Sequence, residues 1–190
     1  MTSFFTRDGD EGFSGLLGKG RIPKFDLRFE GIGDIDEANS ALGLARALCV
    51  NPETKAVLLQ VQRDLYQVMA EAAAPAENAE KFHVIGERHI AWLENQTETC
   101  GAGIAIPDEF IVPGDTLSAA ALDLARTVVR RAERRLAQLL QRGDIQNGDL
   151  LRYLNRLSSL LFVLELRENQ EAGKQNPTLA KMEQNDRDTD

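Results

Sequence analysis

The chain has 190 residues, 43% of them hydrophobic, and a formal net charge of −8 at pH 7. This length supports one substantial core rather than two. The acidic balance argues against general binding to nucleic acid or anionic membranes, which depends on a broad basic surface. No apolar run is long enough to span a bilayer, and the N-terminus lacks the apolar core of a signal peptide. Cys49 and Cys100 lack metal-ligand spacing, so we expect free thiols in a single-domain cytoplasmic protein.

Residues 1–33 are rich in glycine and carry interleaved cations. Glycines allow backbone N–H groups to turn toward an anion, and neighbouring Arg and Lys side chains add positive charge. The pattern favours a polyphosphate-binding segment, although the spacing of a Walker A loop is absent. A flexible arm is the alternative. The glycines are Gly9, Gly12, Gly15, Gly18 and Gly20, and the cations are Arg7, Lys19, Arg21 and Lys24.

Apolar residues recur with helical period in five segments, and no stretch shows convincing strand alternation. Asp34 with Glu37 forms a capping-box pattern at the start of the first helix. We therefore expect an all-α bundle over 34–169, in one domain with the residues before it. The polar residues 170–190 are expected to form a mobile tail. The predicted helices span 34–49, 52–74, 78–98, 116–142 and 147–169.

The stretch RTVVRRAERR, residues 126–135, holds five arginines. On a helical wheel Arg126, Arg130 and Glu133 share one face beside the apolar stripe, and Arg131 and Arg135 point away from it. This placement favours a cleft edge that binds a small anion or a carboxylate. Surface ion pairs within the helix, with Arg134 and Arg130 on either side of Glu133, are the alternative.

Two polar residues and one apolar loop are further candidates for functional or packing contacts. Asp36 lies in the first predicted helical turn, where a carboxylate complements the helix dipole and also offers a partner to an arginine. Asn155 is an amide within a leucine-rich helix and needs hydrogen-bond partners. The loop GAGIAIPDEFIVPG, residues 101–114, contains too many apolar residues to be only a solvated connector, so it is expected to pack against something.

Common catalytic arrangements are missing from the sequence. His83 and His89 are six residues apart, so they do not share a helix face as metal ligands four apart do. No serine or cysteine stands in a nucleophile elbow. We therefore expect neither a protein-bound catalytic metal nor a covalent nucleophile.

Four segments, in this order, resemble the PduO-type ATP:cob(I)alamin adenosyltransferases, and the resemblance runs from residue 6 to about 165. It implies a five-helix bundle that assembles as a homotrimer with active sites between neighbouring subunits. Asp8 and Ser159 depart from the family pattern, which usually has threonine and aspartate there. The matching segments are TRDGDEGFSGLLGKGRIPKFDLRFEGIGDIDEANSALG at 6–43, HIAWLE at 89–94, FIVPG at 110–114 followed by ARTVVRRAERR at 125–135, and LRYLNRLSSLLF at 151–162.

The resemblance also implies roles for individual residues. Arg126 corresponds to an arginine that pairs across the subunit interface with Asp36, and Arg130 to an arginine on the ATP phosphates. Phe110 corresponds to an aromatic residue that packs on the lower face of the corrin and displaces the axial ligand. The implied catalytic residues are Arg130, Asp36, Arg126 and Phe110; the ATP-binding residues are Thr6, Arg7, Gly9, Asp10, Gly12, Ser14, Lys24, Arg130, Glu133 and Asn155; the corrinoid-binding residues are Phe110, Val112, Asp36 and Arg126.

The implied substrates are cobalamin and MgATP, whose Mg²⁺ arrives with the nucleotide rather than on a protein metal site. The implied reaction forms adenosylcobalamin and releases triphosphate. A reductase and an adenosylcobalamin-dependent enzyme are the expected protein partners. Two alternatives remain at this stage: a trimeric corrinoid-binding or delivery protein with reduced or absent transfer activity, and a helical scaffold whose arginines bind an acidic protein.

Overall fold

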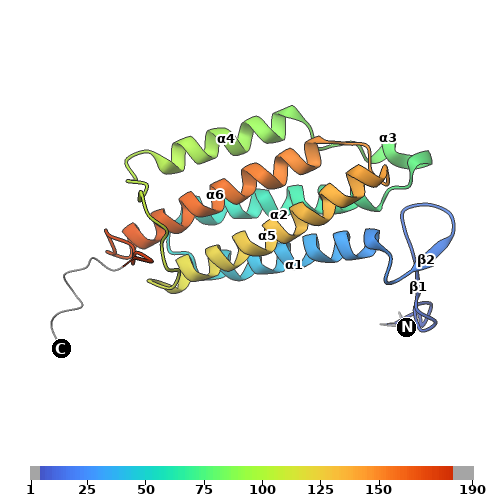
Figure 1. The fold of residues 1–190 in the computed structure, drawn as a ribbon, viewed down its shortest axis with the longest axis horizontal. Helices are drawn as coiled ribbons and strands as arrows, with labels where there is room; N and C mark the ends of the chain where they lie inside the picture. Colours follow the sequence, from blue (N-terminus) through green and yellow to red (C-terminus); the bar gives the residue numbers. More distant parts are fainter. Residues whose placement is uncertain (1–4, 182–190) are drawn as a thin grey trace.

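The computed structural model describes residues 5–181 and forms an elongated helical bundle with a small β-hairpin at one end (Figure 1). Its five long helices confirm the predicted all-α bundle. A 3₁₀ helix, η1 (Ala76–Asn78), and a single-turn helix, α3 (Ala79–Phe82), lie between the second and third of them. The long helices are α1 (Leu27–Leu48), α2 (Pro52–Ala73), α4 (Glu87–Gly101), α5 (Leu117–Arg142) and α6 (Asp149–Glu171).

The hairpin consists of β1 (Phe13–Gly15) and β2 (Arg21–Pro23), which pair antiparallel with Ser14 opposite Ile22. The expectation of no strands was therefore wrong for this segment. Three-residue strands are too short to show the alternation of apolar and polar residues that identifies a strand in a sequence.

Helix α1 begins seven residues earlier than predicted. Asp26 is its N-cap and accepts a hydrogen bond from the backbone N–H of Arg28 at 2.9 Å. Gly31 lies inside the helix against α5. A Cβ on Gly31 would stand 3.0 Å from Leu139, so the missing side chain permits close packing of the two helices.

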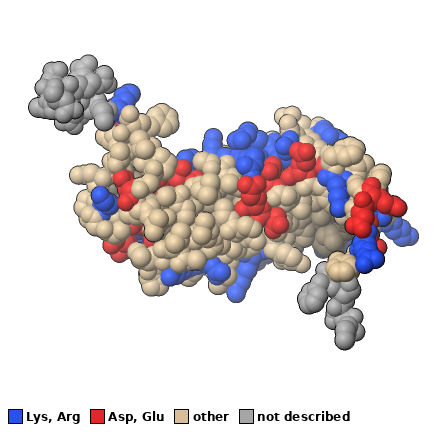
Figure 2. All heavy atoms as spheres, turned by 90° about the horizontal axis from the view of Figure 1, so that it is seen from below, with Lys and Arg blue, Asp and Glu red and all other residues tan. Residues whose placement is uncertain are grey.

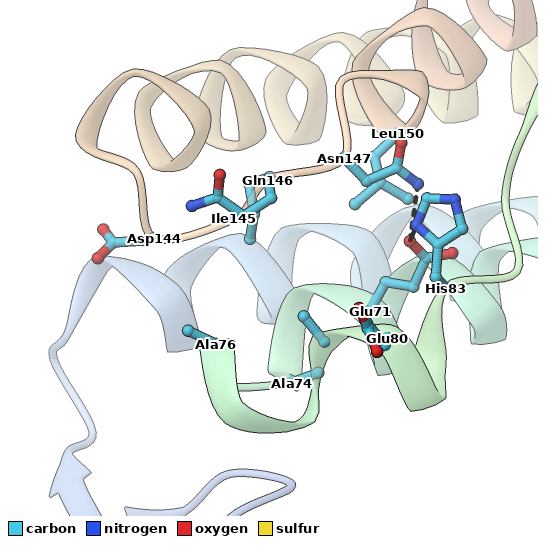
Figure 3. Close-up of a pocket in the computed structure, with 11 residues that line it drawn as sticks. Glu71, Ala74, Ala76, Glu80, His83, Asp144, Ile145, Gln146, Asn147 and Leu150 are labelled. Carbon is cyan, nitrogen blue, oxygen red and sulfur yellow. Dashed lines mark hydrogen bonds and ion pairs between the residues drawn. The ribbon is translucent and has the colours of Figure 1, made fainter.

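The predicted helix over 78–98 is wrong in its first half, because the chain leaves the helical conformation between α3 and α4. The buried carboxylate of Glu71 accepts hydrogen bonds from the backbone N–H groups of Val84 and Ile85 at 2.7 and 2.6 Å, and from Asn147 Nδ2 at 2.8 Å. Figure 3 shows Glu71 with Asn147 and His83 beside it. These backbone donors are used by a distant side chain rather than by a helix.

The remaining helix ends agree with the prediction to within three residues. Thr116 Oγ1 caps α5 by accepting from the N–H of Ala119, and Gly143 at φ 75 ends that helix in the left-handed conformation. The core is formed by the apolar stripes of α1, α2, α4, α5 and α6, with Tyr153 donating to Asp64 at 2.9 Å inside it. Both cysteines are free and buried. Among the described residues no helix is both long and apolar enough to cross a membrane.

Candidate functional site

The N-terminal hairpin holds the predicted polyphosphate-binding residues together. Gly12, at φ 80, occupies a backbone conformation that favours glycine, and its carbonyl accepts from the N–H of Lys24 at 2.8 Å. The N–H of Gly12 donates to Gly9 O at 3.2 Å, and Thr6 Oγ1 accepts from the N–H of Asp8 at 3.3 Å. The turn from Thr6 to Gly12 therefore lies against the end of β2.

Lys24 directs its ammonium group to the glycine turn. A Cβ added to Gly9 would stand 2.7 Å from Lys24 Nζ, so the absence of a side chain at residue 9 makes room for the cation. Arg7 and Asp10 are exposed on the same turn, and Ser14 is half-buried in β1. The structure therefore brings together the seven predicted hairpin residues, with Lys24 as the cation closest to the glycines.

A second group of predicted residues meets between α5 and α6. Asn155 Nδ2 donates to Glu133 Oε1 at 2.9 Å, and Asn155 Oδ1 accepts from Arg156 at 2.8 Å. Arg156 also donates to Glu94 on α4 at 2.8 Å. The alternative in which Glu133 pairs with arginines of its own helix is therefore not observed. A polar chain across three helices fixes the Glu133 carboxylate instead.

Arg130 lies exposed one turn before Glu133. Within residues 5–181 its guanidinium makes no hydrogen bond or ion pair, and the same is true of the carboxylate of Asp36, which is exposed on α1. An exposed cation without a partner retains its charge for a ligand.

Arg126 is engaged within its own helix. Its Nε and a terminal nitrogen donate to Asp123 Oδ1 at 2.8 and 2.5 Å. The structure of a single chain does not bring Arg126 and Asp36 together, so their pairing between subunits stays a prediction. Asp123 was missed by the sequence reasoning, although its position three residues before Arg126 is the spacing of a helix-surface pair.

Two other arginines of residues 126–135 bind α1. Arg131 contacts Asp34 Oδ1 at 3.0 Å and also pairs with Glu37, while Arg135 contacts Glu30 at 2.8 Å. Figure 2, which views the molecule from the side of α1, shows acidic and basic side chains next to one another beside a broad uncharged area. These two arginines therefore hold α1 against α5 and are not available to a ligand.

The loop of residues 102–115, called the Phe110 loop below, presents two predicted corrinoid-binding residues to solvent. Phe110 is 89% exposed and Val112 is 45% exposed. A cavity of about 340 Å³ lies between this loop and the side chains of Asp123, Arg126 and Phe162. The structure thus places Phe110 and Arg126 at one cavity.

One buried carboxyl near this cavity has no counterpart in the sequence predictions. Glu165 on α6 is 1% exposed, and within the described residues neither of its carboxyl oxygens has a hydrogen-bond partner. Burial and then the charge of Asp123 raise the pKa of Glu165 to about 7, while the guanidinium of Arg126 opposes this shift. The only feature of the sequence that indicated burial of this carboxyl is the position of Glu165 in a leucine-rich stretch.

A cavity of about 320 Å³ at the hairpin end is separate from these residues (Figure 3). It is lined by residues around Glu71, Asp144 and Leu150, and none of the predicted site residues contributes to it. Because the Glu71 carboxylate is satisfied by three donors, its role is to shape the fold. Within residues 5–181 no group of three or more His, Cys, Asp or Glu residues is arranged to hold a metal ion.

A family model described as cobalamin adenosyltransferase matches residues 4–168. The chain belongs to the cobalamin adenosyltransferase family. It is 38% identical over 172 residues to a corrinoid adenosyltransferase of Mycobacterium leprae, covering 86% of this chain and 90% of the relative. It is 39% identical over 162 residues to a corrinoid adenosyltransferase of Bacillus subtilis, covering 83% of this chain and 82% of the relative.

A solved structure agrees with this family. A variant PduO-type ATP:corrinoid adenosyltransferase from Lactobacillus reuteri, complexed with cobalamin and ATP, superposes with a TM-score of 0.84 at 32% identity, covering 95% of this chain and 100% of that chain. The predicted family, fold and enzyme class, a corrinoid adenosyltransferase, are therefore confirmed.

Proposed function

We propose that the protein transfers the 5′-deoxyadenosyl group of ATP to cob(I)alamin at a site between neighbouring subunits of a homotrimer. Cobalt supplies the electron pair that forms the bond to the 5′ carbon. The bond from that carbon to the phosphate oxygen breaks, and triphosphate leaves with its electrons. The protein forms no covalent bond to either substrate, so its tasks are orientation and stabilisation of charge.

The observation that carries this proposal is the exposure of Phe110. An 89% exposed aromatic ring at the mouth of a cavity costs hydrophobic free energy unless a ligand covers it. The broad face of a corrin ring is a suitable cover. Packed there, the ring excludes a lower axial ligand, and four-coordinate cob(II)alamin is easier to reduce.

The hairpin and the Phe110 loop lie at opposite ends of the bundle, which supports a site made by two chains (Figure 1). The loop precedes the N-terminus of α5, whereas the hairpin precedes the end of α1 that packs against Leu139 near the C-terminus of α5. A helix of 26 residues is about 39 Å long. One ATP molecule does not bridge this distance, so the hairpin of one copy is expected to serve the cavity of another.

The surface of α1 supports contact with a second copy. Asp36, Leu44 and Leu48 are exposed on α1 and recur at multiples of four residues, which places them along one helix stripe. Leu124 of α5 is also 52% exposed. Apolar side chains on an otherwise charged bundle are typical of a protein interface, and Asp36 beside them is in a position to meet Arg126 of a neighbour.

The roles of the other residues follow from their surroundings. Lys24 and the glycine turn neutralise and enclose the triphosphate of MgATP, and the unpaired Arg130 binds the phosphates from α5. The carboxylate of Glu133, held by Asn155, binds the nucleoside part of ATP. Because cobalt must reach the cob(I) state, a reductase supplies the electron, and an adenosylcobalamin-dependent enzyme of the cytoplasm takes the product.

A spectral assay tests the proposal. The protein is incubated without oxygen with MgATP and chemically reduced cob(I)alamin, and the absorbance is followed in the dark and then under light. We expect a light-sensitive alkylcobalamin and one triphosphate per turnover. A bound-corrinoid spectrum without this product would instead indicate the delivery protein, and failure of MgATP to bind in equilibrium dialysis would indicate a scaffold.

A further inference from the structure

The chain that follows α6 returns to the Phe110 loop. Residues 177–181, called the strap, run antiparallel to residues 110–112, with Ile111 opposite Leu179. The N–H of Val112 donates to Thr178 O at 2.7 Å, and the N–H of Ala180 donates to Phe110 O at 2.7 Å. The strap therefore binds the backbone on both sides of Ile111.

A carboxylate fastens the strap to the start of α5. Asp115 accepts from Thr178 Oγ1 at 2.7 Å and from the N–H of Thr178 at 2.9 Å, and these two hydrogen bonds lower the pKa of Asp115. The next residue, Thr116, caps α5 and donates to the buried Asn169 of α6 at 2.9 Å. The strap is thus tied to a point where two long helices meet.

The strap provides the backbone hydrogen bonds of the central part of the Phe110 loop. Within residues 5–181, the backbone of residues 105–114 makes no hydrogen bond to other backbone groups except the two with the strap. Lys181 adds an ion-pair contact to Glu109 at 3.8 Å. A loop with so few contacts of its own adopts many conformations unless another segment restricts it.

The pairing also determines which side chains face solvent. In an extended segment successive side chains point to opposite sides. Ile111 is half-buried, whereas Phe110 and Val112 are both exposed. The register of Ile111 with Leu179 therefore turns Phe110 and Val112 outward together, and these are the two loop residues predicted to contact the corrinoid.

We infer that the strap is a positioning element of the corrinoid site: residues 177–181, anchored by Asp115, hold Phe110 where its ring can exclude the lower axial ligand of cobalt. This inference rests on the proposed role of Phe110. Asp115 and Thr178 act through the loop backbone and do not touch the substrate.

The test compares two shortened chains. One ends at Asn176 and lacks the strap, and its matched control ends at Lys181 and retains it. Hydrogen–deuterium exchange of residues 105–115, without ligands, reports whether the strap orders the loop. Electron paramagnetic resonance of cob(II)alamin with MgATP reports the fraction of four-coordinate cobalt. The variant Asp115→Ala, which keeps the full chain, provides the same readouts if the shorter chain folds poorly.

We expect the chain ending at Asn176 to exchange at least tenfold faster in the loop and to lose most four-coordinate cobalt, with the KM for ATP changed less than twofold. Asp115→Ala should give intermediate values, and the chain ending at Lys181 should match the full protein. Equal exchange rates of the loop in the two shortened chains would overturn the inference that the strap orders the loop. Faster exchange with unchanged four-coordinate cobalt would overturn the positioning role. Absence of four-coordinate cobalt in the full-length protein would refute the proposed function itself, while exchange would still report on the strap.

Discussion

The side-chain amide of Asn155 on α6 donates to the carboxylate of Glu133 on α5 at 2.9 Å. This hydrogen bond to a charged acceptor restricts a carboxylate that lies one turn from Arg130. If Glu133 binds ATP, its orientation depends on Asn155. We expect Glu133→Gln and Asn155→Ala each to raise the KM for ATP about tenfold, the value of one charge-assisted hydrogen bond.

The double variant should raise the KM little more than either single one, because each change breaks the same arrangement. Steady-state kinetics with saturating cob(I)alamin measures this coupling. Fully multiplicative effects would mean that the two side chains act independently.

Arg130→Ala should lower kcat/KM for ATP by two to three orders of magnitude without loss of thermal stability. Removal of one preorganised charge donor costs roughly 2.7–4 kcal/mol of transition-state stabilisation. Stability is preserved because Arg130 is exposed and has no partner among the described residues. Arg134→Ala is the matched control, since Arg134 is an equally exposed arginine of the same helix. Similar values of kcat/KM for the two variants would show that Arg130 is not part of the ATP site.

Lys24→Ala should weaken MgATP binding about tenfold or more and leave cobalamin binding unchanged, because the ammonium group of Lys24 lies against the glycine turn that is proposed to enclose the triphosphate. Gly9→Ala should have a similar effect, since its Cβ would displace Lys24 Nζ from 2.7 Å. Lys19→Ala, at an exposed lysine in the turn of the same hairpin, is the control. Calorimetric titration measures the affinity of each variant for MgATP and for cobalamin. Weaker binding of cobalamin alone would mean that the hairpin binds the corrinoid and not ATP.

Asp36→Asn and Arg126→Ala should each inactivate the protein, and mixed trimers of the two should recover part of the activity. A subunit exchange produces some interfaces with both original side chains and others with neither. Verified exchange can be followed with two affinity tags, and two batches of Arg126→Ala mixed together serve as the control. Exchange without recovery would reject the intersubunit pair.

Glu165 makes stability depend on pH. Its pKa is about 7 in the folded protein against an ordinary 4.5. Below pH 4.5 the carboxyl is neutral in both states, so it contributes no pH dependence. Between pH 4.5 and 7 the unfolded state ionises first, so stability falls as the pH rises, and above 7 the loss is constant at roughly 3 kcal/mol.

Glu165→Gln should therefore raise the Tm at pH 8 by about 5–10 °C and leave it nearly unchanged at pH 4.5. Glu168→Gln is the control on the same helix. Its carboxylate accepts from the N–H groups of Val50 and Asn51 at 2.8 and 3.2 Å, so its replacement should lower the Tm at both pH values. Calorimetry measures the Tm of each variant at the two pH values. Equal Tm changes for Glu165→Gln at both pH values would contradict a raised pKa of Glu165.

The sequence predicted the long helices well where a local signal marks each end. Helix α5 has a side-chain cap at Thr116 and a left-handed glycine at Gly143, and its limits were predicted to within one residue. The break before α4 was not predictable in this way. It depends on the carboxylate of Glu71, which reaches backbone donors 13 and 14 residues away after the chain has folded.

The candidate site shows the same division between local and distant information. Helical spacing placed Arg130 and Glu133 on one face, and the structure adds Asn155 to them. The strap was missed because residues 170–190 are polar, and polar composition does not show backbone pairing. Of the predicted mobile tail, residues 177–181 pair with the Phe110 loop, and residues 182–190 lie outside the described residues.

The ion pairs of α5 have a consequence for how the protein behaves toward polyanions. Three of the five arginines between residues 126 and 135 are neutralised, by Asp123 on the same helix or by carboxylates of α1. Of these five arginines, only Arg130 and Arg134 have no acidic partner among the described residues. Because polyanion affinity grows with the number of free cations that displace counterions, the protein should pass through a heparin column at physiological salt despite its arginine-rich stretch. Selectivity for a compact triphosphate over longer anions would then arise from the pairing of the arginines rather than from their number.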